Sequence, residues 1–178
     1  MCGITGWTSL PRNAPDESVL GAMVERLALR NRDASLVAVL DRNARRQVVL
    51  AASLADAPSR ISLALDGGPA NSSELRAELA RRGYSFKTNS QEELLLRAYQ
   101  HWDKDVVKHL RGAFALALWD GRKERLLLAR DRFGEKPLYL HERHGGLYFA
   151  SEAKALLELP GAGAADDMQA FSQCLASR

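Results

Sequence analysis

The sequence predicts an α+β domain in which antiparallel sheets pack against helices. Two observations carry this prediction. Short β-rich runs occur as neighbouring pairs joined by tight turns, and the helical patterns come in pairs instead of alternating regularly with the strands. At 178 residues, with 46% hydrophobic and 26% charged residues, the chain has the size and composition of one globular domain with a packed core.

The first third of the chain predicts strands around one helix. Residues 2–7 are expected to form an apolar strand, and residues 36–40 and 47–52 a hairpin joined by a polar segment. Residues 61–65 predict a further strand, ended by a tight turn at Asp66-Gly67-Gly68-Pro69. Between these strands a helix is expected from Asp16, a suitable cap, because apolar residues recur at spacings of three and four: Val19, Leu20, Met23, Val24 and Leu27.

Two helices are expected next. Ser72 or Ser73 can cap the first of them, which Gly83 ends, and the second runs from about residue 90 to residue 101. Each has one apolar face, so both are predicted to pack against a sheet.

The second half predicts two hairpins and a short helix. Residues 114–119 and 125–130 flank an Asp-Gly turn, a strong hairpin signal. Residues 138–140 and 147–150 flank a second turn with two glycines, and residues 151–157 return to a helical pattern that Ser151 can cap.

Composition excludes several classes of protein. The longest apolar runs, 113–119 and 126–129, are too short to cross a bilayer, and no secretory signal is recognisable, so a cytoplasmic location is expected. Cys2 and Cys174 lie at opposite ends and give neither a disulfide framework nor a metal spacing. The net charge of +3 is spread among acidic residues. We therefore expect no membrane or nucleic-acid partner, no metal and no cofactor.

Position 2 holds a candidate nucleophile. Removal of Met1 would make Cys2 the N-terminal residue, and a free α-amine with a pKa of about 7.7 to 8 can take the thiol proton directly or through a water. A bare Met-Cys start is more often an accident of translation, so this interpretation depends on the rest of the chain.

The rest of the chain carries a resemblance. Six segments, in their order and spacing, resemble the glutaminase half of asparagine synthetases: 1–6 (MCGITG), 73–79 (SELRAEL), 110–115 (LRGAFA), 119–120 (WD), 128–139 (LARDRFGEKPLY) and 149–157 (FASEAKALL). The resemblance implies a class II glutamine amidotransferase domain over residues 1–160. Residues 161–178 would then be a tail or the start of a linker to a missing synthetase domain. It also implies the N-terminal-nucleophile hydrolase fold, a four-layer αββα sandwich with two stacked antiparallel sheets.

The resemblance also implies a chemistry. The N-terminal cysteine attacks the side-chain amide of glutamine, forms a thioester and releases ammonia, which an ATP-dependent synthetase domain uses to aminate an adenylated carboxylate. An Asn side chain and a Gly N–H from an Asn-Gly-Glu run form the oxyanion hole. An Arg holds the carboxylate of glutamine and an acidic residue holds its amino group.

This sequence departs from the family at most of these positions. The run reads Asp66-Gly67-Gly68, so the glycine donor remains but a carboxylate replaces the amide. The position expected to bind the α-amino group is Gln91, and the segment expected to hold the Arg contains Ser53 instead. Arg60 is a disfavoured substitute for that Arg. The candidate residues are therefore Cys2 and Gly67 for catalysis, and Asp66, Gly68, Gln91 and Ser53 for binding the substrate.

Two hypotheses follow. In the favoured one, the domain is a pseudoenzyme or poor glutaminase that serves as the structural partner of an ATP-dependent asparagine synthetase-like domain or protein. In the alternative, Cys2 still hydrolyses glutamine or another small amide and supplies ammonia to that synthetase. Retention of Cys2 favours the enzyme, whereas Asp66, Gln91 and Ser53 favour the structural role.

Overall fold

The fold contains two β-sheets, and the first of them includes the N-terminal strand. The computed structural model describes residues 3–9, 14–16, 18–28, 37–42, 47–52, 54–56 and 58–161. The first sheet has five antiparallel strands, in the order β2 (Val37–Arg42), β3 (Gln47–Ala52), β1 (Thr5–Ser9), β9 (Gly146–Ala150) and β8 (Tyr139–Arg143). The strand β1 therefore lies at its centre.

The second sheet has four antiparallel strands. Their order is β4 (Leu54–Asp56), β5 (Ile61–Gly67), β6 (Phe114–Asp120) and β7 (Arg125–Arg130). The pairs β2–β3, β6–β7 and β8–β9 are the three hairpins that the sequence predicts.

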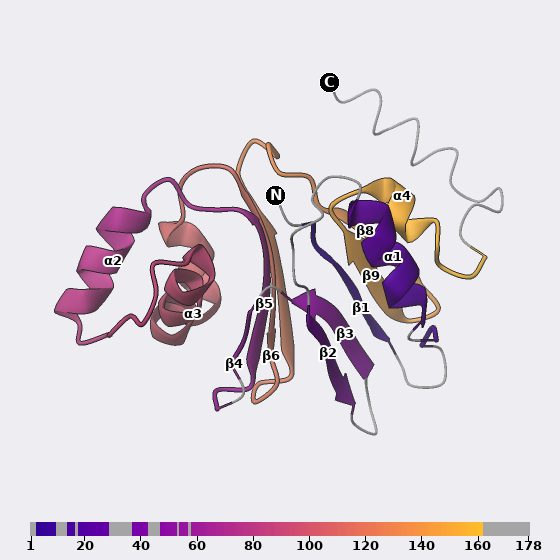
Figure 1. Ribbon diagram of the computed structural model, residues 1–178, viewed down its shortest axis with the longest axis horizontal. Coiled ribbons are helices and arrows are strands. Elements are labelled where there is room, and N and C mark those ends of the chain that lie inside the picture. Colours follow the sequence, from indigo (N-terminus) through magenta and orange to yellow (C-terminus); the bar gives the residue numbers. More distant parts are fainter. Residues whose placement is uncertain are drawn as a thin grey trace.

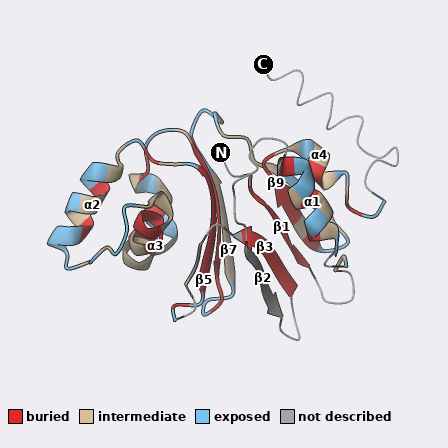
Figure 2. Ribbon diagram, viewed as in Figure 1, coloured by how far each residue is buried: buried red, intermediate tan, exposed pale blue. Residues whose placement is uncertain are grey.

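Helices cover the outer faces of both sheets. On the four-stranded sheet lie α2 (Ser72–Arg81) and α3 (Gln91–Trp102), followed by a 3-10 helix η2 (Asp103–His109). On the five-stranded sheet lie α1 (Ser18–Ala28) and α4 (Ala153–Leu156). The result is a helix, sheet, sheet, helix order of layers (Figure 1), with buried strands inside and exposed outer helix faces (Figure 2). This confirms the predicted four-layer sandwich. No helix among the described residues is long and apolar enough to cross a membrane.

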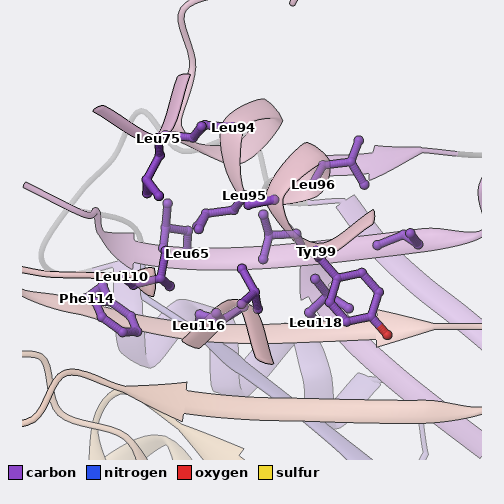
Figure 3. Packing of buried hydrophobic residues seen from close by; sticks show 14 of the residues in the cluster. Leu65, Leu75, Leu94, Leu95, Leu96, Tyr99, Leu110, Phe114, Leu116 and Leu118 are labelled. Atoms are coloured by element: carbon purple, nitrogen blue, oxygen red, sulfur yellow. The ribbon is translucent and has the colours of Figure 1, made fainter. Parts of the chain in front are cut away.

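Alternating side chains explain how the second sheet serves two cores. Leu65 of β5 and Leu116 of β6 face α3, where they pack with Leu95 (Figure 3). The residues that alternate with them, including Ala64 and Ala115, face the other sheet instead. Small side chains there let the two sheets approach each other closely.

Ile4 is at the centre of the layer between the sheets. It is fully buried and packs in one cluster with Leu50, Phe149 and Ala115. Its N–H donates to Ser151 Oγ at 2.8 Å, and its carbonyl accepts from the Ser151 N–H at 2.8 Å. The chain is thus held firmly two residues after Cys2.

Some element boundaries differ from the predictions. The first strand is Thr5–Ser9 and not 2–7, and β5 continues through Gly67 instead of ending at residue 65. The strand β4 and the helix η2 were not predicted, because each is short and neither has a distinctive apolar period. Asp16 does cap α1, since its Oδ1 accepts from the Ser18 N–H at 2.9 Å.

Two predicted caps are wrong. The N-cap of α2 is Asn71, not Ser72 or Ser73, and its side chain instead donates to the His109 carbonyl and accepts from the Arg111 N–H. The N-cap of α4 is Glu152, because the Ser151 hydroxyl bonds to Ile4. At the start of α4, a contact between distant segments thus replaces the local one.

Candidate functional site

The end of β5 carries three of the candidate residues. Asp66 and Gly67 pair with Ala115 and Phe114 of β6, and the Gly68 N–H donates to the Ala113 carbonyl at 3.1 Å. Because side chains alternate along a strand, Asp66 shares the face of Ala64, which looks toward the five-stranded sheet and Ile4. The strand thus brings Asp66 to the layer between the sheets.

Gly67 is required by both conformation and space. Its φ is +79°, a left-handed value that glycine adopts readily and other residues rarely do. A Cβ here would lie 2.4 Å from the Ala113 carbonyl oxygen and 2.9 Å from Lys136 Cε. The glycine that the resemblance assigns to the oxyanion hole therefore also has a structural reason to be glycine in this chain.

Asp66 is paired with a cation that sequence reasoning missed. Lys136 Nζ lies 3.1 Å from Asp66 Oδ1, and the two side chains are only 15% and 9% exposed. The alkyl stem of Lys136 also passes over Gly67. Asp66 at the end of a predicted strand was a usable signal, because a buried carboxylate requires a cationic partner. The sequence does not reveal which Lys or Arg residue reaches the end of the strand.

The loop after β7 fixes the position of Lys136. Asp131, 5% exposed, accepts backbone N–H bonds from Phe133 and Glu135 on Oδ1, at 3.1 and 2.9 Å, and from Lys136 on Oδ2 at 2.9 Å. Burial alone raises the pKa of Asp131, but these hydrogen bonds outweigh it and hold the pKa below its usual range. The ionised carboxylate ties the loop that presents Lys136 to Asp66.

Gln91 meets Gly68 at the start of α3. Its Nε2 donates to Ser72 Oγ at 3.3 Å, while its Oε1 is buried and has no hydrogen-bond partner among the described residues. A Cβ at Gly68 would lie 3.2 to 3.5 Å from Gln91 side-chain atoms. Gln91 thus packs against Gly68, one residue after Gly67.

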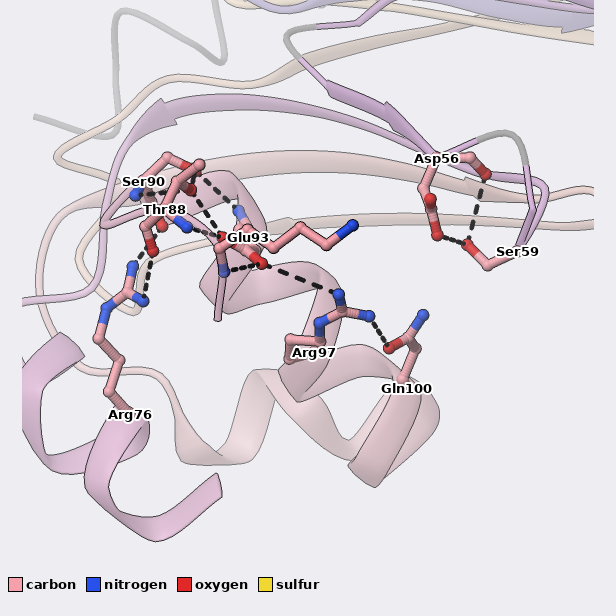
Figure 4. Close-up of polar contacts among 9 residues, drawn as sticks. Asp56, Ser59, Arg76, Thr88, Ser90, Glu93, Arg97 and Gln100 are labelled. Atoms are coloured by element: carbon pink, nitrogen blue, oxygen red, sulfur yellow. Dashed lines mark hydrogen bonds and ion pairs between the residues drawn. The ribbon is translucent and has the colours of Figure 1, made fainter. Parts of the chain in front are cut away.

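A polar network holds the segment before Gln91 (Figure 4). Arg76 donates to the carbonyls of Thr88 and Ser90, at 3.2 and 2.5 Å. Glu93 accepts the N–H groups of Lys87 and Thr88, at 2.9 and 2.7 Å, and Ser90 Oγ accepts the Glu93 N–H at 3.1 Å. Burial raises the pKa of Glu93, but the hydrogen bonds from Lys87 and Thr88 outweigh it and keep that pKa below its usual range.

The described residues bring together four of the six candidates: Asp66, Gly67, Gly68 and Gln91. Cys2 and Ser53 lie outside the described residues, as does Met1. Arg60 precedes the start of β5, whereas Gly67 ends it, so about 20 Å of extended strand separates them. Arg60 therefore lies at the opposite end of β5 from Gly67.

Two other features lie apart from this constellation. A cavity of about 470 Å³ is lined by Thr8 and by residues 142–147 at the β8–β9 turn, and none of the candidate residues lines it. Within the described part of the chain, no three His, Cys, Asp or Glu side chains are grouped to hold a metal ion.

Comparison with known proteins gives the following matches. A family model described as a glutamine amidotransferase domain matches residues 1–178. Asparagine synthetase [glutamine-hydrolyzing] 3 of Bacillus subtilis (strain 168) is 34% identical over 187 residues, 97% of this chain and 30% of that protein. A putative asparagine synthetase [glutamine-hydrolyzing] of Mycobacterium tuberculosis (strain ATCC 25618 / H37Rv) is 45% identical over 105 residues, 58% of this chain and 16% of that protein. The chain thus spans less than a third of these relatives.

A solved structure shows the same fold. The glutamine phosphoribosylpyrophosphate amidotransferase of B. subtilis, complexed with ADP and GMP, superposes with a TM-score of 0.62 at 16% identity. The match covers 87% of this chain and 43% of that chain. Together with the two stacked antiparallel sheets, this likeness confirms the fold of the N-terminal-nucleophile hydrolases.

Proposed function

Because this chain belongs to the glutamine amidotransferase domain family, we propose that it is an asparagine synthetase-type domain with an altered glutamine pocket. It is weak or inactive as a glutaminase and acts in the cytoplasm as the structural partner of an ATP-dependent, amide-forming synthetase, carried in the same longer protein or on another chain. The relatives in which this domain recurs are themselves called glutamine-hydrolysing asparagine synthetases, which supports the kind of partner.

The observation that carries this proposal is the Asp66–Lys136 pair. An ionised carboxylate has no N–H to give to a developing oxyanion, and losing one such donor costs on the order of a hundred- to a thousandfold in rate. Lys136 compensates the charge of Asp66 but also anchors the carboxylate, 9% exposed, at the end of β5. The aspartate that replaces the asparagine at position 66 is thus held in place by its ion pair with Lys136.

A second candidate function is an active, Cys2-dependent glutaminase that converts glutamine to glutamate and ammonia for the synthetase. It is favoured by Gly67, which keeps its left-handed conformation, and by Lys136, which removes much of the repulsion that a bare carboxylate would exert. In that case Lys136 offsets the change at position 66.

The test is ammonia release from glutamine, measured against a Cys2→Ala variant and a working glutaminase in parallel. Intact mass must first show that Met1 has been removed, since the α-amine is otherwise locked in a peptide bond. We expect a Cys2-dependent rate at least about a hundredfold below the working enzyme. A rate close to that enzyme would favour the second function and overturn the first.

A further inference from the structure

The backbone that follows Gly67 leaves the sheet and is held by a neighbouring segment. The Gly68 N–H donates to the Ala113 carbonyl at 3.1 Å, and the Ala70 N–H donates to the Arg111 carbonyl at 2.6 Å. Both carbonyls belong to the stretch between the end of η2 and the start of β6. The position of the chain just after Gly67 therefore depends on where that stretch lies.

The hydrogen-bond pattern at this strand end directs the Gly67 N–H away from β6. Hydrogen-bonded and non-hydrogen-bonded pairs alternate along an antiparallel ladder. Because Gly68 bonds to Ala113, the preceding pair, Gly67 with Phe114, is a non-hydrogen-bonded one. The N–H that the resemblance assigns to the oxyanion hole thus keeps its direction while Gly68 and Ala113 stay bonded.

Asn71 bonds to the same neighbouring stretch with its side chain. Its Nδ2 donates to the His109 carbonyl at 2.9 Å, and its Oδ1 accepts from the Arg111 N–H at 3.1 Å. The Asn71 carbonyl accepts from the Leu75 N–H at 3.1 Å, as expected of a helix N-cap. One residue thus joins the start of α2 to the segment that holds Gly68.

Close packing adds to this contact. Gly112 has a φ of +108°, and a Cβ there would lie 2.7 Å from the Ala70 N and 2.9 Å from the Ala70 Cβ. The backbone at Gly112 therefore lies directly against the chain between Gly68 and Asn71, so that a shift of one segment moves the other.

We propose that Asn71 is a positioning residue of this site: by bridging the backbone groups of His109 and Arg111, its side-chain amide keeps the Gly67 N–H in place for an oxyanion. The inference rests on the proposed function for the chemistry of the site and deepens it, because it names a residue that sets the geometry of the glycine donor. An amide suits this role, since it has a donor and an acceptor on one planar group.

Asn71→Asp tests the bridge separately from the helix cap. Aspartate is about as good as asparagine at an N-cap, so α2 should form, but an ionised carboxylate cannot donate to the His109 carbonyl. Asn71→Ala is the second variant, because it removes both side-chain contacts without adding a charge. Tyr99→Phe is the matched control, since it removes one hydrogen bond, from the Tyr99 hydroxyl to Asp120 Oδ2, at the opposite end of β6.

Amide hydrogen exchange measured by NMR reports the strand end directly. We expect the Gly68 N–H to exchange at least about tenfold faster in both Asn71 variants, while the Ala64 N–H in the middle of β5 follows the global stability. In Tyr99→Phe, the ratio of the Gly68 rate to the Ala64 rate should stay within about twofold of the wild type. A general loss of stability would change both rates alike.

The kinetics of Cys2-dependent ammonia release from glutamine, with Met1 removed, give the second readout. In Asn71→Asp, a displaced donor should lower kcat at least about tenfold and change KM less than about threefold, because the donor acts on the transition state more than on bound glutamine. Tyr99→Phe should keep both constants within about twofold of the wild type.

An exchange ratio that stays at its wild-type value in both Asn71 variants would overturn the inference, and so would an unchanged kcat in a variant whose Gly68 amide exchanges faster. If the wild type shows no measurable Cys2-dependent turnover, the exchange ratio alone decides. Rapid ammonia release by the wild type would instead overturn the proposed function and leave the role of Asn71 to the same two measurements.

Discussion

Gly67 lies at the end of β5 in a left-handed conformation, and Ala113 and Lys136 lie close to its Cα. A side chain at this residue meets the Ala113 carbonyl at 2.4 Å and the stem of Lys136 at 2.9 Å. A single substitution at Gly67 would therefore disturb the end of β5.

Gly67→Ala should therefore lower the free energy of unfolding by at least about 2 kcal/mol, because positive φ and the clash with backbone both oppose a Cβ. Urea titration measures the change. Gly21→Ala is the matched control: Gly21 lies inside α1 with nothing within 4 Å of an added Cβ. That variant should be more stable by about 0.5 to 1 kcal/mol. Equal effects of the two substitutions would contradict the described strand end.

At the scale of elements, the start of α3 depends on an ionised Glu93. Its carboxylate accepts two backbone N–H groups and the Thr88 hydroxyl, which places the residues just before Gln91. Because the folded-state pKa of Glu93 is lowered, its contribution to stability is present above the unfolded-state value near 4.5. That contribution is lost as the pH falls through the folded-state pKa.

Glu93→Gln should lower the free energy of unfolding by about 1 to 3 kcal/mol at pH 7. The NH2 group of Gln would face a backbone N–H that now donates to a carboxylate oxygen of Glu93. The difference between wild type and variant should shrink as the pH falls below about 4, which urea titrations across pH 3 to 7 measure. Glu78→Gln, which removes an exposed pair with Arg82 on α2, should cost less than about 1 kcal/mol. A wild-type advantage that stays constant down to pH 3 would argue against an ionised Glu93.

The sequence was most informative about elements and least informative about their ends. The Asp-Gly turn after β6 and the two β-rich runs of β2 and β3, joined by a polar segment, are local signals, so their hairpins were predictable. The cap of α4 was not, because the Ser151 hydroxyl bonds to Ile4, far away in the chain. Local propensity identifies residues that can cap a helix but not those that another segment has already engaged.

Across the whole molecule, the two sheets close over the start of β1. Ile4 is fully buried between them, with Ala64 and Ala115 from the second sheet in the same cluster. The segment that follows Cys2 is therefore part of the core.

Ile4→Ala should cost about 2 to 5 kcal/mol of unfolding free energy, because it leaves a cavity where both sheets meet. Leu157→Ala is the control, since Leu157 is 61% exposed at the end of α4 and its loss should cost less than about 1 kcal/mol. Thermal or urea unfolding reports both. A small effect of Ile4→Ala would mean that the N-terminal segment is not packed between the sheets.

The layers followed from the sequence, through the resemblance and the order of its motifs, whereas the roles of the candidate residues stay predictions. Lys136 did not, although it lies in one of those motifs, because its contact with Asp66 joins residues 70 positions apart. Arg60 is close to Asp66 in sequence yet precedes β5, so the length of one strand separates it from the site. Which charged residues lie beside Asp66 therefore depends on contacts between segments that are far apart in the sequence.

In the proposed function Asp66 stands in place of a donor of the oxyanion hole, and Asp66→Asn puts an amide back at that position. The Asn oxygen can still accept from Lys136 while its amide N–H groups become available to the oxyanion. Asp120→Asn is the matched control: Asp120 is fully buried on β6 and accepts from the Tyr99 hydroxyl, so its loss should lower stability without raising the rate.

The decisive measurement is Cys2-dependent ammonia release from glutamine by wild type and by Asp66→Asn, with Met1 removed from both. We expect slow ammonia release by the wild type and a rate at least about tenfold higher in Asp66→Asn. A wild-type rate already close to that of a working glutaminase, or a rate that stays the same or falls in Asp66→Asn, would contradict this expectation.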